Sequence, residues 1–90
     1  MEVEFDPAKR AKIAAERGLD IARADEVFDG PTLTTEDDRY DYGETRWISF
    51  GYLDGRMVVV VWTQRGERRR IITMRKANVR EQATRSRRLR

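Results

Sequence analysis

One β-hairpin in the second half of the chain constrains the fold more than any other feature. Within residues 47–52 the apolar side chains of Ile48, Phe50 and Tyr52 alternate with Trp47, Ser49 and Gly51. The segment therefore has one apolar face, which is typical of a half-buried strand. Asp54-Gly55 follows, a dipeptide that favours a two-residue hairpin turn. Residues 57–63 are then apolar almost throughout, which predicts a strand covered on both faces. The sequence therefore predicts an antiparallel sheet with this return strand near its centre.

Three other segments are predicted to extend this sheet. A turn at residues 65–67 leads into an apolar-rich strand over 69–75. Near the N-terminus, residues 3–5 have apolar side chains at alternate positions and predict a short first strand. Residues 32–35 are compatible with an edge strand, and the polar stretch 36–43 is expected to be a loop.

Two helices are predicted between the first strand and the hairpin. Asp6 can cap a helix over residues 7–17, in which Pro7 occupies a tolerated first position and Gly18 ends the helix. Residues 21–29 carry apolar side chains at helical spacing after Asp20, which is expected to cap this second helix.

A third helix is predicted near the C-terminus. Asn78 can cap it, and Glu81 stands three residues later as in a capping box. The basic residues 85–90 are expected to fray. The predicted class is α+β: a short N-terminal strand, two helices, an antiparallel meander sheet and a C-terminal helix, with the helices on one face.

The chain is expected to form one domain over residues 1–90, because 90 residues hold only one modest core. It has no cysteine, so no disulfide supports that core. The N-terminus does not resemble a signal peptide, and the longest apolar run, residues 57–62, is too short to cross a membrane. These features predict a soluble, cytoplasmic protein without a membrane partner.

Charge is distributed very unevenly along the chain. Residues 1–45 hold 6 basic and 13 acidic side chains, a net of −7, whereas residues 46–90 hold 13 basic and 3 acidic ones, a net of +10. All but three of the basic residues are arginine, which binds phosphate through a planar fork of N–H groups. The asymmetry indicates either a basic surface that contacts nucleic acid or a charged surface that is simply solvated.

The residue types present exclude several kinds of chemistry. With no histidine and no cysteine, the chain lacks the commonest general base and every usual zinc ligand except carboxylate. The acidic cluster Glu36-Asp37-Asp38 could bind a hard cation or be only a solvated loop. No phosphate-binding glycine loop and no nucleophile elbow occur. We therefore expect neither a metal nor a cofactor.

RNA cleavage suits the remaining residues, because RNA carries its own nucleophile, the 2′-hydroxyl. A protein that aligns this group and places cations around the phosphate supplies the main catalytic terms. We expect Arg46, Arg70, Arg75 and Lys76 to lie on one side of the sheet, with Arg70, Arg75 and Lys76 catalytic. Such a site needs only an RNA substrate and no cofactor.

Each candidate also has a purely structural interpretation. Arg75 and Lys76 end a strand, where basic residues are often solvated. Of the consecutive residues 68–70, one is expected to point inward, and Arg70 is the preferred candidate. Glu81 is interpreted as a helix cap rather than a catalytic acid.

The aromatic residues are candidates for stacking on RNA bases. Tyr40 and Tyr42, in the loop, are the preferred ones, whereas Trp62 is expected to lie in the core.

An ordered set of motifs resembles the BrnT family of type II toxins and spans nearly the whole chain. The matching segments are Phe5-Asp6-Pro7-Ala8-Lys9, Arg17-Gly18-Leu19-Asp20, Ala24-Asp25-Glu26-Val27-Phe28, Gly43-Glu44-Thr45-Arg46, Gly55-Arg56-Met57-Val58-Val59-Val60, Thr63-Gln64-Arg65-Gly66 and Arg70-Ile71-Ile72-Thr73-Met74-Arg75-Lys76-Ala77 followed by Glu81. The last segment is the most specific.

The resemblance implies a RelE-like fold and a ribonuclease that inhibits translation. It further implies neutralisation by a BrnA-type antitoxin in a hetero-oligomer, which represses its own promoter through DNA contacts of the antitoxin. Arg70 and Arg75 would bind the scissile phosphate, while Arg46 and Arg65 would position neighbouring phosphates. Lys76 would donate a proton or add positive charge.

The chain departs from the family pattern in its first helix. Many members carry Asn and then Lys-His-Gly where this chain has Ile13 and Glu16-Arg17-Gly18. The departure at Arg17 leaves open a second interpretation, a non-catalytic basic nucleic-acid-binding module or an inactivated toxin. Both interpretations predict RNA binding that weakens steeply with salt, and only the enzyme predicts cleavage.

Overall fold

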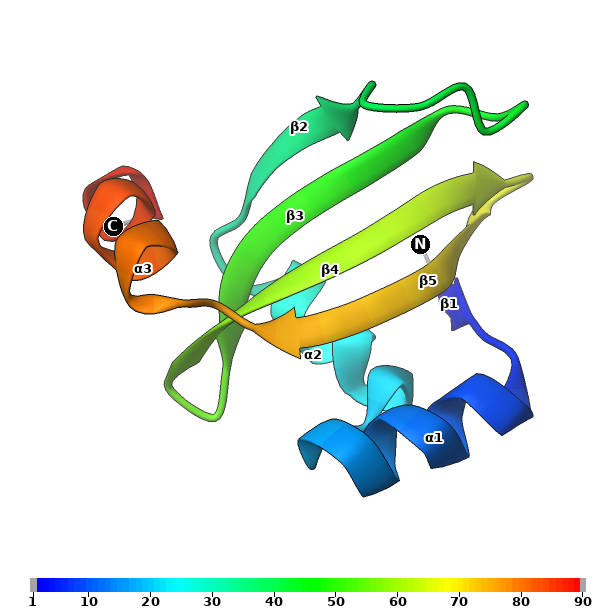
Figure 1. Ribbon diagram of the computed structural model, residues 1–90, viewed down its shortest axis with the longest axis horizontal. Helices are drawn as coiled ribbons and strands as arrows, with labels where there is room; N and C mark the ends of the chain where they lie inside the picture. The colour runs from blue at the N-terminus through cyan, green and yellow to red at the C-terminus, as the bar shows by residue number, and fades with distance from the viewer. Residues whose placement is uncertain (1, 90) are drawn as a thin grey trace.

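The computed structural model describes residues 2–89 and contains a five-stranded sheet with helices against it (Figure 1). In chain order the elements are β1 (Glu2–Glu4), α1 (Pro7–Arg17), a 3₁₀ turn (Ile21–Arg23), α2 (Ala24–Asp29), β2 (Leu33–Asp37), β3 (Arg46–Leu53), β4 (Arg56–Arg65), β5 (Arg68–Lys76), α3 (Val79–Arg85) and a second 3₁₀ turn (Ser86–Leu89). No helix within residues 2–89 is both long enough and apolar enough to span a membrane.

The sheet is mixed, with strand order β1-β5-β4-β3-β2. Strands β2 to β5 pair antiparallel with their neighbours, but β1 pairs parallel with β5. The prediction of a wholly antiparallel sheet is therefore wrong at this edge. Parallel pairing requires a long crossover between the two strands, and all the elements from α1 to β4 lie between β1 and β5 in the chain.

The predicted hairpin and its central strand are confirmed. Strand β4 lies in the middle of the sheet between β3 and β5. Asp54 and Gly55 form the turn, with φ angles of 52° and 75°. Positive φ at both positions is what a type I′ hairpin turn requires, and it explains why this dipeptide joins the two strands.

Helices cover both faces of the sheet, so the prediction that they share one face is wrong. Successive residues of β4 point to opposite sides: Val58 and Val60 join a core cluster with residues of α1 and α2, whereas Val59 joins another with Leu89. We call these sides the α1/α2 face and the α3 face. Leu89 is 3% exposed, so the expected fraying of residues 85–90 is also wrong for the described part of that segment.

The caps explain where the helices begin. The Asp6 side chain accepts a hydrogen bond from the Ala8 amide at the start of α1. Asp20 likewise accepts from the Ala22 amide, but it begins the 3₁₀ turn, and α2 starts only at Ala24. The second predicted helix is therefore divided in two. The capping box predicted for α3 is confirmed.

The remaining sheet predictions hold, with two corrections. An edge strand is present at β2, but it continues through Glu36 and Asp37, which were expected to lie in a loop. Trp62 lies in the core at 8% exposure. Strand β3 is covered on both faces rather than one. Its Ser49 is fully buried and accepts a hydrogen bond from Trp62 Nε1 at 2.9 Å.

Candidate functional site

A β-bulge in β5 determines which arginines share a face. Trp62 pairs with Ile71 but Val61 pairs with Thr73, so one extra residue, Ile72, is inserted in β5. In a regular strand, residues five apart point to opposite faces. The extra residue reverses this relation, and Arg70 and Arg75 both point to the α3 face.

Lys76 does not share that face. It pairs with Val58, whose side chain belongs to the α1/α2 core, whereas Arg75 pairs with Val59 on the α3 side. The expectation that Arg46, Arg70, Arg75 and Lys76 lie on one side of the sheet is wrong for Lys76, because adjacent strand residues point in opposite directions. Lys76 instead lies at the end of β5, where it lines cavities beside the hairpin turn.

Arg69, not Arg70, packs into the α1/α2 core. Its guanidinium lies 3.9 Å from the centre of the Phe28 ring and 5.1 Å from that of Trp62. Burial lowers the pKa of Arg69, and its Nε has no hydrogen-bond partner within residues 2–89. The preference for Arg70 as the inward residue is therefore wrong. Arg70, opposite Thr63, is half-buried on the α3 face.

Arg46 reaches the same face from β3. Its neighbour Trp47 packs into the α1/α2 cluster, so Arg46 points the other way. The Arg46 guanidinium lies 4.0 Å from the centre of the Tyr42 ring. The Tyr42 hydroxyl in turn donates a hydrogen bond to Asp37 at 3.1 Å.

Two further arginines lie at this face that the sequence reasoning did not select. Arg85 of α3 lies 4.2 Å from the centre of the Phe50 ring. Arg39 donates hydrogen bonds to Asp37, and its charge is close enough to Arg75 to oppose the rise in the Arg75 pKa. We call the set Arg39, Arg46, Arg70, Arg75 and Arg85 the arginine face. Their sequence separation left no local signal that they would meet.

Carboxylates engage some of these arginines. Glu81 accepts two hydrogen bonds from Arg75, at 2.7 and 2.8 Å, and this lowers the pKa of Glu81 to about 2. Arg39 lowers the pKa of Asp37 to about 2 in the same way. Both carboxylates are therefore ionised at neutral pH and have no proton to donate. Glu81 is a cap, as predicted, and it also holds Arg75.

Arg70, like Arg85 but unlike Arg39, Arg46 and Arg75, forms no ion pair with any residue in the 2–89 range. Arg46, by contrast, pairs with Glu44 at 3.1 Å. Arg65, at the end of β4, is 56% exposed and lies 3.7 Å from the same carboxylate. Among the predicted site residues, Arg70 therefore has a guanidinium not neutralised by an acidic side chain.

The two loop tyrosines differ in exposure. Tyr40 is 71% exposed and makes an edge contact with Tyr42, with ring centres 5.9 Å apart. Tyr42 is half-buried, and burial together with the hydrogen bond to Asp37 raises the pKa of its hydroxyl. Tyr40 has an accessible ring for stacking, whereas Tyr42 supports Arg46 and keeps its proton at neutral pH.

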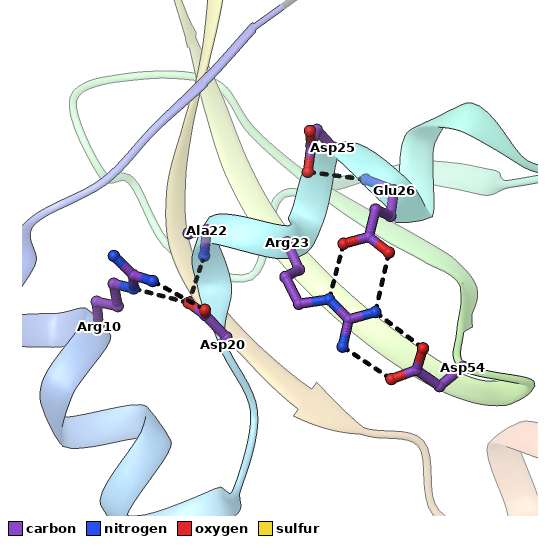
Figure 2. A network of polar contacts seen from close by, with 7 residues as sticks. All are labelled: Arg10, Asp20, Ala22, Arg23, Asp25, Glu26 and Asp54. Atoms are coloured by element: carbon purple, nitrogen blue, oxygen red, sulfur yellow. Dashed lines mark hydrogen bonds and ion pairs between the residues drawn. The ribbon is translucent and has the colours of Figure 1, made fainter.

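On the other side of the molecule, acidic residues form ion pairs with Arg10 and Arg23 (Figure 2). Arg23 donates to both Glu26 and Asp54, joining the 3₁₀ turn to α2 and the β3–β4 turn. Arg10 of α1 forms a two-bond pair with Asp20. Two acidic residues of the first half of the chain, Asp20 and Glu26, are thus used in ion pairs there.

Arg17, at the departure from the family pattern, has a structural role. It donates hydrogen bonds to the Thr73 hydroxyl and the Met74 carbonyl, both at 2.9 Å. Lys9 donates to the carbonyl of the bulged residue Ile72. These contacts satisfy backbone groups that β1 does not reach, and they hold α1 against the irregular part of β5.

We expect Glu81→Gln to lower the free energy of unfolding at neutral pH by about 1 kcal/mol, an ion-pair contribution reduced by solvent exposure. Glutamine can still form the capping box, so the change isolates the contact with Arg75. The pKa of Glu81 lies at about 2, below its ordinary 4.5. The ionised carboxylate therefore stabilises the fold above that ordinary value, and the stabilisation is lost as the pH falls toward 2.

Urea unfolding at a series of pH values measures this effect. Glu67→Gln serves as the control, because Glu67 is exposed and has no ion pair within residues 2–89. An equal loss of stability at neutral pH and near pH 2 would show that the ion pair does not stabilise the fold.

The structure offers no cluster typical of a bound metal. Within the described range, 2–89, no three acidic side chains converge on a point that could hold a metal ion. Asp37 and its neighbours Glu36 and Asp38 do not form such a group, since Asp37 is buried and bound to Arg39 while the other two are exposed.

Comparison with protein families identifies the family of this chain. A family model described as "Ribonuclease toxin, BrnT, of type II toxin-antitoxin system" matches residues 5–81. No curated protein matches the chain significantly. The matched residues include four of the five members of the arginine face: Arg39, Arg46, Arg70 and Arg75.

Proposed function

The chain belongs to the BrnT family of ribonuclease toxins of type II toxin–antitoxin systems, and from this premise we propose that it cleaves RNA on the arginine face. The observation that carries the proposal is the bulge in β5, which turns Arg70 and Arg75 toward the same side. Bulges often re-aim side chains beside active sites. We also propose that the fold is the RelE-like one that the family resemblance implies.

The proposed reaction is transfer of the phosphate within the RNA, without a metal. The 2′-oxygen forms a bond to phosphorus as the bond to the 5′-oxygen breaks. The 2′-hydroxyl loses a proton and the leaving 5′-oxygen gains one, so the products are a 2′,3′-cyclic phosphate and a 5′-hydroxyl. Negative charge grows on the phosphate oxygens during this step, and fixed cations stabilise it.

Arg70 and Arg75 are proposed to bind the scissile phosphate. Arg70 is half-buried and has no competing carboxylate within residues 2–89, so its fork can meet phosphate oxygens directly. Arg75 is held in a fixed orientation by Glu81. Because Arg75 is bound by this carboxylate, its contribution is a positioned charge rather than a complete fork.

The surrounding residues are proposed to hold the rest of the RNA. Arg46 begins β3 and Arg65 ends β4, so both lie at the end of the sheet that carries the β4–β5 turn. They would contact the phosphates next to the one that is cut. The exposed Tyr40 ring would stack on a base, and the Tyr42 ring would hold the Arg46 guanidinium in place. Lys76 lies on the other side of β5 and would add charge along the RNA.

Membership of a type II family implies an antitoxin partner. We propose that this is a BrnA-type protein that covers the arginine face in a hetero-oligomer, because covering it would block RNA. The complex is proposed to act in the cytoplasm and to bind promoter DNA through the antitoxin.

A non-catalytic RNA-binding module is the second candidate function. It is favoured by the role of Arg17, which is bound to β5 backbone and side-chain oxygens and stands where many family members carry histidine. On this view the arginine face would bind RNA without cutting it.

Two incubations of the purified chain separate these candidates: one with free RNA in EDTA, and one with ribosomes translating an RNA in Mg²⁺. We expect cleavage of free RNA in EDTA, with 2′,3′-cyclic phosphate and 5′-hydroxyl ends. Ends of the opposite type, or cleavage of free RNA only after a divalent metal is added, would contradict the proposed reaction. Salt-sensitive binding with intact RNA under both conditions would instead favour the binding module.

A further inference from the structure

A cavity between the β3–β4 turn and α3 has the features of a nucleotide site. It has a volume of about 440 Å³ and is lined at the hairpin by Tyr52, Gly55 and Arg56 and opposite them by Gln82 and Ser86. In Figure 1 the hairpin turn and α3 lie on the same side of the molecule. The volume falls within the roughly 300–1,000 Å³ typical of small-ligand sites.

The charge of the cavity wall selects for an anion. Arg56 and Lys76 both line it, and no acidic side chain does. Neither of these two residues forms an ion pair within residues 2–89. The neighbouring cavity on the α1/α2 side, which Arg56 and Lys76 also line, differs because two carboxylates line it as well, Asp20 and Asp54, and Asp54 pairs with its Arg23.

The polar and aromatic groups of the wall suit a base. Tyr52 is half-buried and packs against the α3 core, which gives its ring a fixed orientation. The Gln82 side-chain amide donates to the Ala77 carbonyl at 3.1 Å, which orients its remaining donor and acceptor. Aromatic rings bind bases by stacking, and amide and hydroxyl groups can read their edges.

The cavity is also next to the arginine face along the chain. Lys76 and Ala77 of its wall follow Arg75 directly, and Gln82 follows Glu81, the carboxylate that holds Arg75. An RNA bound at Arg75 would therefore have the cavity within reach.

We propose that this cavity binds one nucleotide of the RNA, next to the phosphate that is cut. Arg56 and Lys76 bind its phosphate, Tyr52 stacks on its base, and Gln82 and Ser86 contact the base edges. The inference rests on the proposed ribonuclease function and names the subsite that selects where RNA is cut.

The cavity is tested by NMR titration of the isotope-labelled full chain with the four nucleoside 5′-monophosphates, and with ribose 5-phosphate as the probe without a base. We expect shifts at the Gly55 amide and the Gln82 side-chain amide, with at least one nucleotide binding about tenfold more tightly than ribose 5-phosphate because its base stacks. Arg56→Ala should weaken nucleotide binding several-fold. Lys12→Ala removes one charge from the exposed side of α1 and should have no effect.

Two outcomes of the titration would overturn the proposal. One is equal binding of ribose 5-phosphate and all four nucleotides, since the base would then make no contact. The other is equal binding by Arg56→Ala and Lys12→Ala, since the phosphate would then lie elsewhere.

Sequencing of cleavage products tests the role in site selection. Gln82→Ala is expected to change the base preference beside the cut, whereas Lys12→Ala is expected to keep it. If the chain cuts RNA and both variants keep the wild-type preference, the cavity does not select the cut site. If no RNA is cut, the ribonuclease proposal fails, while the titration still decides whether the cavity binds a nucleotide.

Discussion

Arg70→Ala is expected to reduce the rate of RNA cleavage by about 100-fold or more, the usual cost of removing one preorganised donor to transition-state charge. Arg70 is half-buried on the α3 face and forms no ion pair within residues 2–89. Its charge is therefore available to the phosphate. The rate is measured with purified protein on a labelled RNA, with far-UV circular dichroism to show that the variant is folded.

Two variants make this test specific. Arg70→Lys keeps the charge but loses the planar fork, so it should recover only part of the activity. Arg10→Ala removes an arginine from α1, on the opposite side, and with it an exposed ion pair to Asp20 and a contact with the Phe5 ring, so cleavage should be unchanged. A folded Arg70→Ala protein with the same rate as Arg10→Ala would remove Arg70 from the site.

Gly51→Ala is expected to destabilise the protein by about 3 kcal/mol, at the upper end of the usual cost of overpacking a core. A Cβ at Gly51 would lie 2.6 Å from a methyl group of Val27 and 3.2 Å from one of Thr32. Both β3 and α2 would have to move apart. This loss is a large part of the total stability of a domain of this size, roughly 5–13 kcal/mol.

Thermal and urea unfolding measure the loss, and a second glycine supplies the control. Gly30→Ala places its Cβ no closer than 3.9 Å to its nearest neighbour, the Val27 carbonyl, and should have little effect. Adding Val27→Ala to Gly51→Ala removes the clashing methyl group, so the double variant should lose less than the two single losses combined. Strict additivity would show that the contact is not the cause.

Local sequence signals predicted the elements of this fold well. The Asp54-Gly55 turn, the central strand and the Asn78 capping box each depend on neighbouring residues only, and each is confirmed. The positions of α3 and Leu89 were not predicted correctly. Burial of Leu89 depends on contacts with residues such as Phe50 and Met57, which are distant in sequence.

The candidate site was harder to predict, because its geometry depends on one inserted residue. Nothing in the run Ile71-Ile72-Thr73 marks Ile72 as the bulge. In a regular strand, successive side chains point to opposite faces, so Arg70 would share a face with Lys76. Because of the bulge, Arg70 instead shares a face with Arg75. Arg39 was also missed, because its place at the arginine face follows from its bonds to the buried Asp37.

Induced expression in a bacterial host, comparing wild type with Arg70→Ala, tests the central claim most directly because the cell supplies both RNA and ribosomes. Growth and total RNA are followed at matched levels of soluble protein. The account predicts growth arrest with fragmented RNA from the wild type, and normal growth with intact RNA from the variant. Arrest and RNA fragmentation from both proteins, or intact RNA in cells with abundant soluble wild type, would contradict it.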